Sequence, residues 1–450
     1  MDWKEKIIAG VAAHEAEYIR TADAIWDHPE IHFQEHASSG LLKTLLRTNG
    51  FAVEERLDGM PTAFRASWGT GRPVIAFLAE YDALAGMSQQ AGATTCTPLE
   101  AGQPGHGCGH NLLGTGACAA AITVKELLAA QQLPGTVVCF GCPAEETGSA
   151  KAFMARDGVF NGLDAILSWH PWDYTGIWPG GSLANVKLQF RFHGKRAHAA
   201  ASPELGRSAL DALELMNVGV QFLREHIPQD ARVHYAITDA GGKAANVVQS
   251  YAEAVYLVRA ARLEQLADIQ QRVIDCARGA ALMTGTNVEV QFIKGCSNLL
   301  LNTELDRLLV SSMEALGAPQ YTEEERSFAA SLQETLEHTE DTLRLISRPC
   351  SPADRRSILA HRGESIYGFV APYAPSEAPL VTISTDVGDA SWFAPTAQMS
   401  AAAWPAGTPA HSWQAVAVGK SSMAHKAMLF AARSLALTAQ RLMTEPDLLR

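Results

Sequence analysis

Three apolar runs, each followed by acidic or imidazole side chains, most constrain the fold of this chain. The runs cover residues 74–79, 136–141 and 165–169, and they are followed by Glu80-Tyr81-Asp82, Glu145-Glu146 and His170. Short continuous apolar runs are typical of strands buried on both faces of a parallel sheet. Because such sheets bind ligands beyond the carboxyl ends of their strands, the polar groups are expected to converge on one crevice.

Each of these polar groups also has a simpler interpretation. Glu145 and Glu146 could form a solvated turn or a charge pair at a helix N-terminus. His170 could be a histidine that is hydrogen-bonded at the edge of the core. Three such groups at three strand ends, together with a nearby Cys/His loop, favour a functional site over three separate coincidences.

The Cys/His loop is the glycine-rich stretch 105–111, GHGCGHN, which leads into an apolar helix predicted over residues 112–130. It places Cys108 and His110 two residues apart at a loop-to-helix junction. A thiolate and an imidazole are suitable ligands for zinc and its neighbours. A C-x-H pair alone is weak evidence, since glycine-rich turns also carry chance Cys and His residues.

Composition excludes several classes of protein. The net charge of −12 argues against a nucleic-acid partner, which requires clustered Lys and Arg. No apolar run approaches the roughly 20 residues that span a bilayer, and the N-terminus lacks the apolar core of a signal peptide. The eight scattered cysteines are typical of a reduced protein. We therefore expect a cytoplasmic protein that binds neither nucleic acid nor membrane.

Residues 185–297 have a pattern of their own. The predicted strands cover 186–193, 231–238, 253–261 and 287–294, and the predicted helices cover 206–226 and 263–283. This β-α-β-β-α-β order predicts a ferredoxin-like α+β module inserted in a larger domain. The larger domain, residues 1–184 and 298–450, is predicted to be α/β, with a mixed, mostly parallel sheet covered by helices on both faces.

The flanking elements complete this prediction. Helices are expected over residues 8–25, 38–49, 303–316 and 422–441, with a charged helical insertion at 322–346 and a strand at 381–385. A Pro/Gly loop near the C-terminus carries His411. Neither G-x-S-x-G nor a phosphate-binding glycine loop occurs in a suitable context, which disfavours serine-hydrolase and nucleotide chemistry.

Four stretches, residues 25–30, 80–86, 105–114 and 384–389, resemble the M20 metallopeptidases, within them the amidohydrolase branch that includes auxin-conjugate hydrolases. The resemblance covers nearly the whole chain and identifies the inserted module as a lid and dimerisation domain. Two positions depart from it. Glu80-Tyr81-Asp82 stands where most members have H-x-D, and Asn111 stands where many auxin-conjugate hydrolases have Asp.

The resemblance implies two divalent metal ions, manganese or zinc, held by Cys108, His110, Glu146, His170 and His411. It further implies that Glu145 is the general base that activates water. His110 is expected to replace the missing His of H-x-D, with Asp82 orienting a ligand. Since adjacent residues at a strand end point to different sides, one glutamate of the doublet can bind metal while the other faces water.

Three lid residues match functional positions of the family. The resemblance implies that His198 reaches a partner subunit's active site and stabilises the oxyanion, although a histidine in a surface turn is the alternative. Asn246 and Arg259 match positions that hold the carboxylate of the substrate. Arg259 could equally form a salt bridge at a strand end.

The implied activity is hydrolysis of the amide between an aromatic acyl group and an acidic amino acid, with p-aminobenzoyl-glutamate as the first candidate. An indole-3-acetyl-aspartate hydrolase, or another N-acyl amino acid hydrolase, is the alternative within this class. The alternative from another class is a non-catalytic or partner-dependent subunit. The expected assembly is a homodimer, or a heterodimer with a related subunit.

Overall fold

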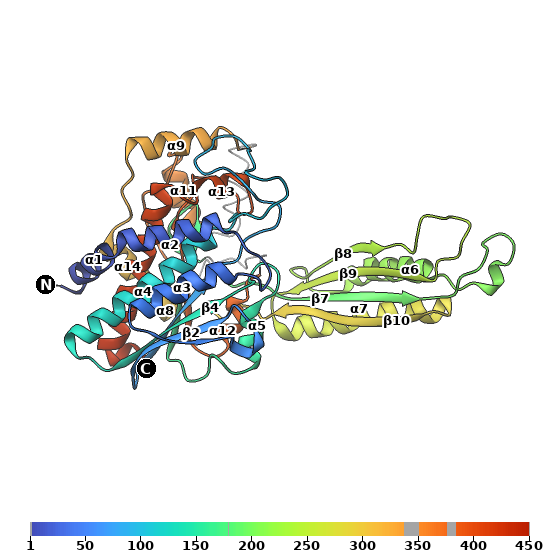
Figure 1. Ribbon diagram of the computed structural model, residues 1–450. Helices are drawn as coiled ribbons and strands as arrows, with labels where there is room; N and C mark the ends of the chain where they lie inside the picture. The colour runs from blue at the N-terminus through green and yellow to red at the C-terminus, as the bar shows by residue number, and fades with distance from the viewer. Residues whose placement is uncertain (1, 179, 337–350, 376–383, 450) are drawn as a thin grey trace. The chain divides into compact units, whose positions relative to one another are not determined.

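A computed structural model describes residues 2–178, 180–336, 351–375 and 384–449. The chain divides into two compact units, drawn in Figure 1. Unit 1 comprises residues 1–181, 300–381 and 389–450, and unit 2 comprises residues 182–299 and 382–388. The functional division expected from the sequence, with residues 185–297 as the lid, stays a prediction.

Unit 1 contains a seven-stranded sheet in the order β1-β2-β4-β3-β5-β11-β6. Its strands are β1 (Ala52–Glu55), β2 (Phe64–Thr70), β3 (Val74–Glu80), β4 (Gly135–Cys142), β5 (Ala165–Trp172), β6 (Gly176–Ile177) and β11 (Thr396–Ala402). The inner strands β4, β3, β5 and β11 are parallel, whereas β1, β2 and β6 pair antiparallel. The carboxyl ends of β4, β3 and β5 therefore lie side by side, as the sequence predicts.

Helices flank this sheet, which confirms the predicted α/β architecture of unit 1. The longer ones are α1 (Trp3–Ala13), α2 (Glu15–Asp27), α3 (His36–Thr48), α4 (His110–Gln131), α8 (Thr303–Leu316), α9 (Glu323–Gln333) and α14 (Ser422–Thr444). The shorter ones are α5 (Ala150–Arg156), α11 (Pro352–Ala360), α12 (Val387–Ser391), which begins in unit 2, and α13 (Trp413–Val418).

Helix α4 is the central helix of unit 1, and it packs against β3 and α14. Gly114 allows a close approach to β3, because a Cβ atom there would lie 2.5 Å from the Glu80 carbonyl oxygen. Gly109, in the left-handed conformation at φ 73°, begins the helix. These two glycines set the first turn of α4, with His110, beside the end of β3.

Helix α4 also corrects one expectation from the sequence. By length and composition alone it is apolar enough to cross a membrane, although no such run was expected. However, 83% of its most apolar window is buried within the structure. The apolar residues of α4 therefore form the core against the sheet and α14.

Unit 2 has the predicted β-α-β-β-α-β order. It comprises β7 (Ala184–His193), α6 (Ala209–Leu223), β8 (Arg232–Asp239), β9 (Tyr251–Ala260), α7 (Leu263–Thr284) and β10 (Asn287–Cys296). The strands form an antiparallel sheet in the order β10-β7-β9-β8 (Figure 1). One apolar cluster joins this sheet to α6 and α7, so unit 2 has its own core.

Some elements differ from those that the sequence predicts. The helix expected over residues 8–25 is two helices, α1 and α2, separated at His14. Strand β11 was not predicted. The strand expected at 381–385 lies mostly outside the described residues, and Ser384 and Thr385 are not in a strand. Helix α9 contributes Ala329 and Leu332 to the core and is therefore no solvated insertion, whereas residues 337–346 lie outside the described residues.

Candidate metal centre

Seven side chains predicted to form the site converge in unit 1. They come from the ends of β3 and β5, from the loop after β4, from the start of α4 and from the loop before α13. Two groups of possible ligands have all their donor atoms within 4.8 Å of one another. The groups are Cys108, His110 and His170, and Cys108, Glu146 and His411. Cys108 belongs to both, which is the arrangement expected of a ligand shared by two cations.

His110 is completely buried and firmly oriented. Its Nδ1 atom lies 2.9 Å from Asp82 Oδ1, while its Nε2 atom is buried and makes no hydrogen bond among the described residues. The second oxygen of Asp82 accepts a hydrogen bond of 3.0 Å from the backbone N–H of Glu146. Asp82 therefore fixes a histidine and the acidic doublet together, which is the orienting role expected for it.

His170 is oriented in the same manner. Its Nδ1 atom lies 2.7 Å from the carbonyl oxygen of Pro171, so Nδ1 carries the proton, and Nε2 faces Cys108 Sγ at 3.4 Å. Burial and the charge of His110 lower the pKa of His170 to about 4. The imidazole is therefore neutral at pH 7, which is the form that binds a metal.

Two residues of the site have unusual backbone conformations. Ala144, immediately before the acidic doublet, has φ 53°, and His411 has φ 60°. Non-glycine residues rarely adopt positive φ and do so mostly where the surrounding structure requires it. These turns bring His411 Nε2 to 3.2 Å from Glu146 Oε1.

The charges of the site suit a bound cation. Despite burial, contact with His411 and the charge of His110 lower the pKa of Glu146 to about 2, so its carboxylate is ionised at pH 7. Burial, with the charge of Glu146, raises the pKa of the Cys108 thiol well above its ordinary value. A metal ion deprotonates a coordinating thiol and would also satisfy the His110 Nε2 atom. The sulfur, nitrogen and oxygen donors thus fit divalent metals such as zinc.

Sequence reasoning missed one residue that faces the site and one beneath it. Glu80 and His110, together with Glu145, form a third group of possible ligands within 4.8 Å. The other oxygen of Glu80 lies 2.7 Å from Lys151 Nζ, and the Lys151 side chain is fully buried. The departure from H-x-D was the available signal for Glu80, whereas no sequence pattern marks Lys151.

The three predicted lid residues lie in unit 2. His198 is exposed, and its Nδ1 atom accepts hydrogen bonds from the backbone N–H groups of Ala200 and Ala201, which leaves the proton on Nε2. The backbone of Asn246 accepts a hydrogen bond from Ala199, so these loops are adjacent. Arg259 donates to Ser384 Oγ at 3.0 Å and makes no ion pair within the described residues. The roles of all three stay predictions.

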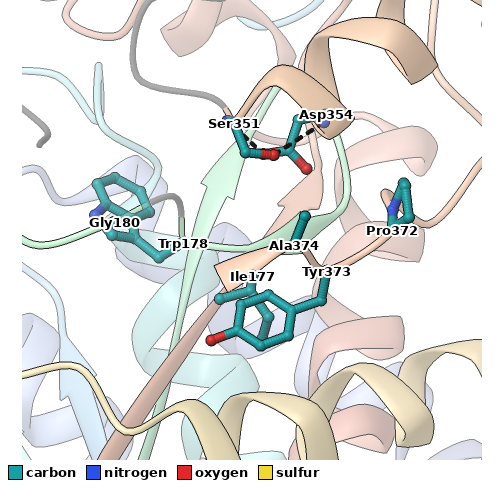
Figure 2. A pocket seen from close by; sticks show the side chains of 8 residues that line it. All are labelled: Ile177, Trp178, Gly180, Ser351, Asp354, Pro372, Tyr373 and Ala374. Atoms are coloured by element: carbon teal, nitrogen blue, oxygen red, sulfur yellow. Dashed lines mark hydrogen bonds between the residues drawn. The ribbon is translucent and has the colours of Figure 1, made fainter. Parts of the chain in front are cut away.

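A pocket beside β6 and α11 contains none of the predicted site residues. Figure 2 shows it with Ser351 and Asp354, whose mutual hydrogen bonds cap α11. Its volume is about 20 Å³, which accommodates roughly one water molecule. It is too small for an aromatic acyl group and is not a candidate substrate pocket.

Comparisons with known proteins agree with this arrangement. The model of peptidase family M20/M25/M40 matches residues 76–354. The chain is 47% identical to one of the subunits of the p-aminobenzoyl-glutamate hydrolase of Escherichia coli K12, covering 98% of this chain and 92% of that protein. This protein belongs to peptidase family M20/M25/M40. As an M20 member with this site it is a hydrolase, and it uses divalent metal.

Two further likenesses place it within the family. It is 30% identical to indole-3-acetyl-aspartic acid hydrolase of Enterobacter agglomerans, over 52% of this chain and 56% of that protein. The fold also matches a Bacillus subtilis structure described as a dinuclear metal-binding peptidase of the M20 family. That match has a TM-score of 0.60 and 17% identity, and covers 96% and 99% of the two chains.

Asp173, on the loop after β5, gives this M20 protein a pH-dependent stability. Its Oδ2 atom accepts a hydrogen bond from Gly407 N–H, its Oδ1 atom has no hydrogen-bond partner among the described residues, and burial raises its pKa to about 7. As pH rises from about 4 to 7, the unfolded chain loses this proton before the folded protein does. The contribution of Asp173 to stability is therefore present below about pH 4 and lost by about pH 7.

We expect Asp173→Asn to raise the melting temperature at pH 8 by roughly 2–4 °C, because the amide keeps the acceptor without the buried charge. At pH 5 the gain should be smaller, since Asp173 is then neutral in the folded protein. Thermal melts of both proteins at the two pH values test this. An equal gain at pH 5 and pH 8 would contradict the charge argument.

Proposed function

We propose that this protein is a two-metal amidohydrolase that cleaves p-aminobenzoyl-glutamate to p-aminobenzoate and glutamate. The observation that carries the proposal is the pair of ligand groups sharing Cys108, with Glu145 beside them. The 47% identity to a subunit of an aminobenzoyl-glutamate hydrolase, over nearly the full length of both chains, supports the substrate. Manganese and zinc are the proposed metals.

The reaction needs a base, a held water and a stabilised oxyanion. When bound, the divalent cations supply Lewis acidity toward the amide carbonyl and the attacking water. Glu145 takes a proton from that water and returns it to the leaving amine. Asp82 keeps His110 and the acidic doublet in position through its two oxygens. The proton on His198 Nε2 suits this side chain to stabilise the oxyanion, from a partner subunit.

Aromatic residues support an aromatic acyl group. The rings of Trp178 and Trp172 lie 5.3 Å and 6.2 Å from that of His170, and Trp172 is partly exposed. Aromatic rings favour stacked or edge-on contacts at such distances. Arg259, which has no carboxylate partner among the described residues, is the proposed clamp for the substrate carboxylate, with Asn246.

Two alternatives follow from the same residues. An indole-3-acetyl-aspartate also presents an aromatic group and a carboxylate, and the 30% identity to a hydrolase of that compound keeps it as the second candidate. A non-catalytic subunit is not favoured, because the ligand groups and Glu145 are intact. A cytoplasmic homodimer, or a heterodimer with a related subunit, is the proposed state.

The first experiment is hydrolysis by the chain purified alone, with added manganese or zinc. We expect kcat/KM for p-aminobenzoyl-glutamate to exceed that for indole-3-acetyl-aspartate by at least about tenfold, which corresponds to roughly 1.4 kcal/mol of transition-state binding. Including p-aminobenzoyl-aspartate separates the effect of the acyl group from that of the amino acid. Light scattering on the same sample gives the oligomeric state.

The reverse preference would favour the auxin-conjugate alternative. Cleavage of none of the three compounds by a metal-loaded chain would contradict the proposal and favour a missing partner subunit. Adding a related subunit to that inactive sample would then restore turnover only if the site is completed by the second chain.

A further inference from the structure

Glu80 and Lys151 form an ion pair that is almost completely withdrawn from solvent. Lys151 Nζ lies 2.7 Å from Glu80 Oε1, and the side chains are 0% and 2% exposed. Glu80 is the last residue of β3, and Lys151 lies in the first turn of α5. Because desolvation of both charges offsets their attraction, a buried pair of this kind is weak evidence for stability. Its position beside the metal centre points to another role.

The second oxygen of Glu80 faces the metal centre. Oε2 lies 3.4 Å from His110 Nε2, the buried atom that makes no hydrogen bond among the described residues. His110 Nδ1 is held by Asp82, which fixes the ring with Nε2 toward Glu80. Two ligands of one tetrahedral zinc ion, each about 2.1 Å from it, lie about 3.4 Å apart. The two atoms therefore have the separation expected of ligands on one cation.

We propose that Glu80 is a further ligand of the cation held by His110, and that Lys151 is the positioning residue that orients it. Cys108, His110 and His170 supply three donors, and the Oε2 atom of Glu80 completes a set of four. Lys151 holds the Oε1 atom of Glu80 and so directs a single oxygen toward the cation. The inference rests on the proposed two-metal function, which it deepens by adding a ligand.

Cobalt titration of the metal-free full-length protein tests this, because visible absorbance reports both stoichiometry and coordination. We expect two Co²⁺ ions per chain in the wild type. Glu80→Gln should weaken the binding of one ion by at least about tenfold and change its absorbance, while the other ion binds as before. Lys151→Met should weaken the same ion, and Glu80→Gln/Lys151→Met should bind it no more weakly than Glu80→Gln alone.

The matched control is Lys420→Met, which removes a more exposed lysine paired with Asp27 and should leave cobalt binding unchanged. The double variant guards against misfolding, since it leaves neither buried charge without its partner; circular dichroism checks the fold of each metal-free variant. Wild-type affinities and spectra for both ions in Glu80→Gln and in the double variant would overturn the inference alone. A wild-type chain that binds fewer than two ions would overturn the two-metal function, and this inference with it.

Discussion

Glu145→Gln is expected to lower kcat for p-aminobenzoyl-glutamate by about 10²–10⁴-fold while leaving the bound metal nearly unchanged. The amide keeps the shape of the side chain but cannot accept the proton of the attacking water. The neighbouring Glu146 is the doublet residue grouped with Cys108 and His411, and its backbone N–H is held by Asp82. The two glutamates therefore have separate expected roles, base and ligand.

Metal analysis decides between these roles. Glu145 also lies in a group of possible ligands with Glu80 and His110, so a ligand role is the competing interpretation. If Glu145 is the base, the variant retains two ions per chain and the KM changes little. Glu146→Gln is the matched control and should lose metal. Full activity in Glu145→Gln would show that the base has been wrongly assigned, and loss of an ion would make Glu145 a ligand.

Cys108→Ala is expected to reduce the content of both metal ions and to lower kcat/KM by more than about 100-fold. Cys108 is the residue common to both ligand groups, so its removal takes one donor from each cation. Even changes to residues behind the ligands commonly cost 10–100-fold in metal affinity or activity. Burial of the thiol also means that its thiolate form depends on the positive charge of the cations.

Cys118→Ala is the matched control, because Cys118 is equally buried on α4 but belongs to neither ligand group. It should keep two ions per chain and most of the activity, and any change should be a small loss of stability. Metal content, kcat/KM and melting temperature of the two variants separate metal binding from packing. Retention of both ions in Cys108→Ala would contradict its role as a shared ligand.

Much of the fold could be predicted because most elements have a sequence pattern of their own. The inner strands β3 and β4 are continuous apolar runs, and the elements of unit 2 alternate or repeat with clear periods. Strand β11 has no such pattern. It consists largely of Ala, Ser and other residues with little preference for strands, yet all seven residues are buried between β5 and β6. Its neighbours in the sheet, rather than its own residues, make it a strand.

The candidate site divides along the same line. The sequence alone determined the chemistry: a Cys/His loop, an acidic doublet and an imidazole at the ends of apolar runs, which indicate a metal-dependent hydrolase. Only the tertiary structure decided which atoms face one another, because that depends on long-range packing, such as the approach of α4 to β3 at Gly114. That packing turns His110 Nε2 toward Glu80 and buries Lys151 behind it, a contact between residues 71 positions apart that no local pattern encodes.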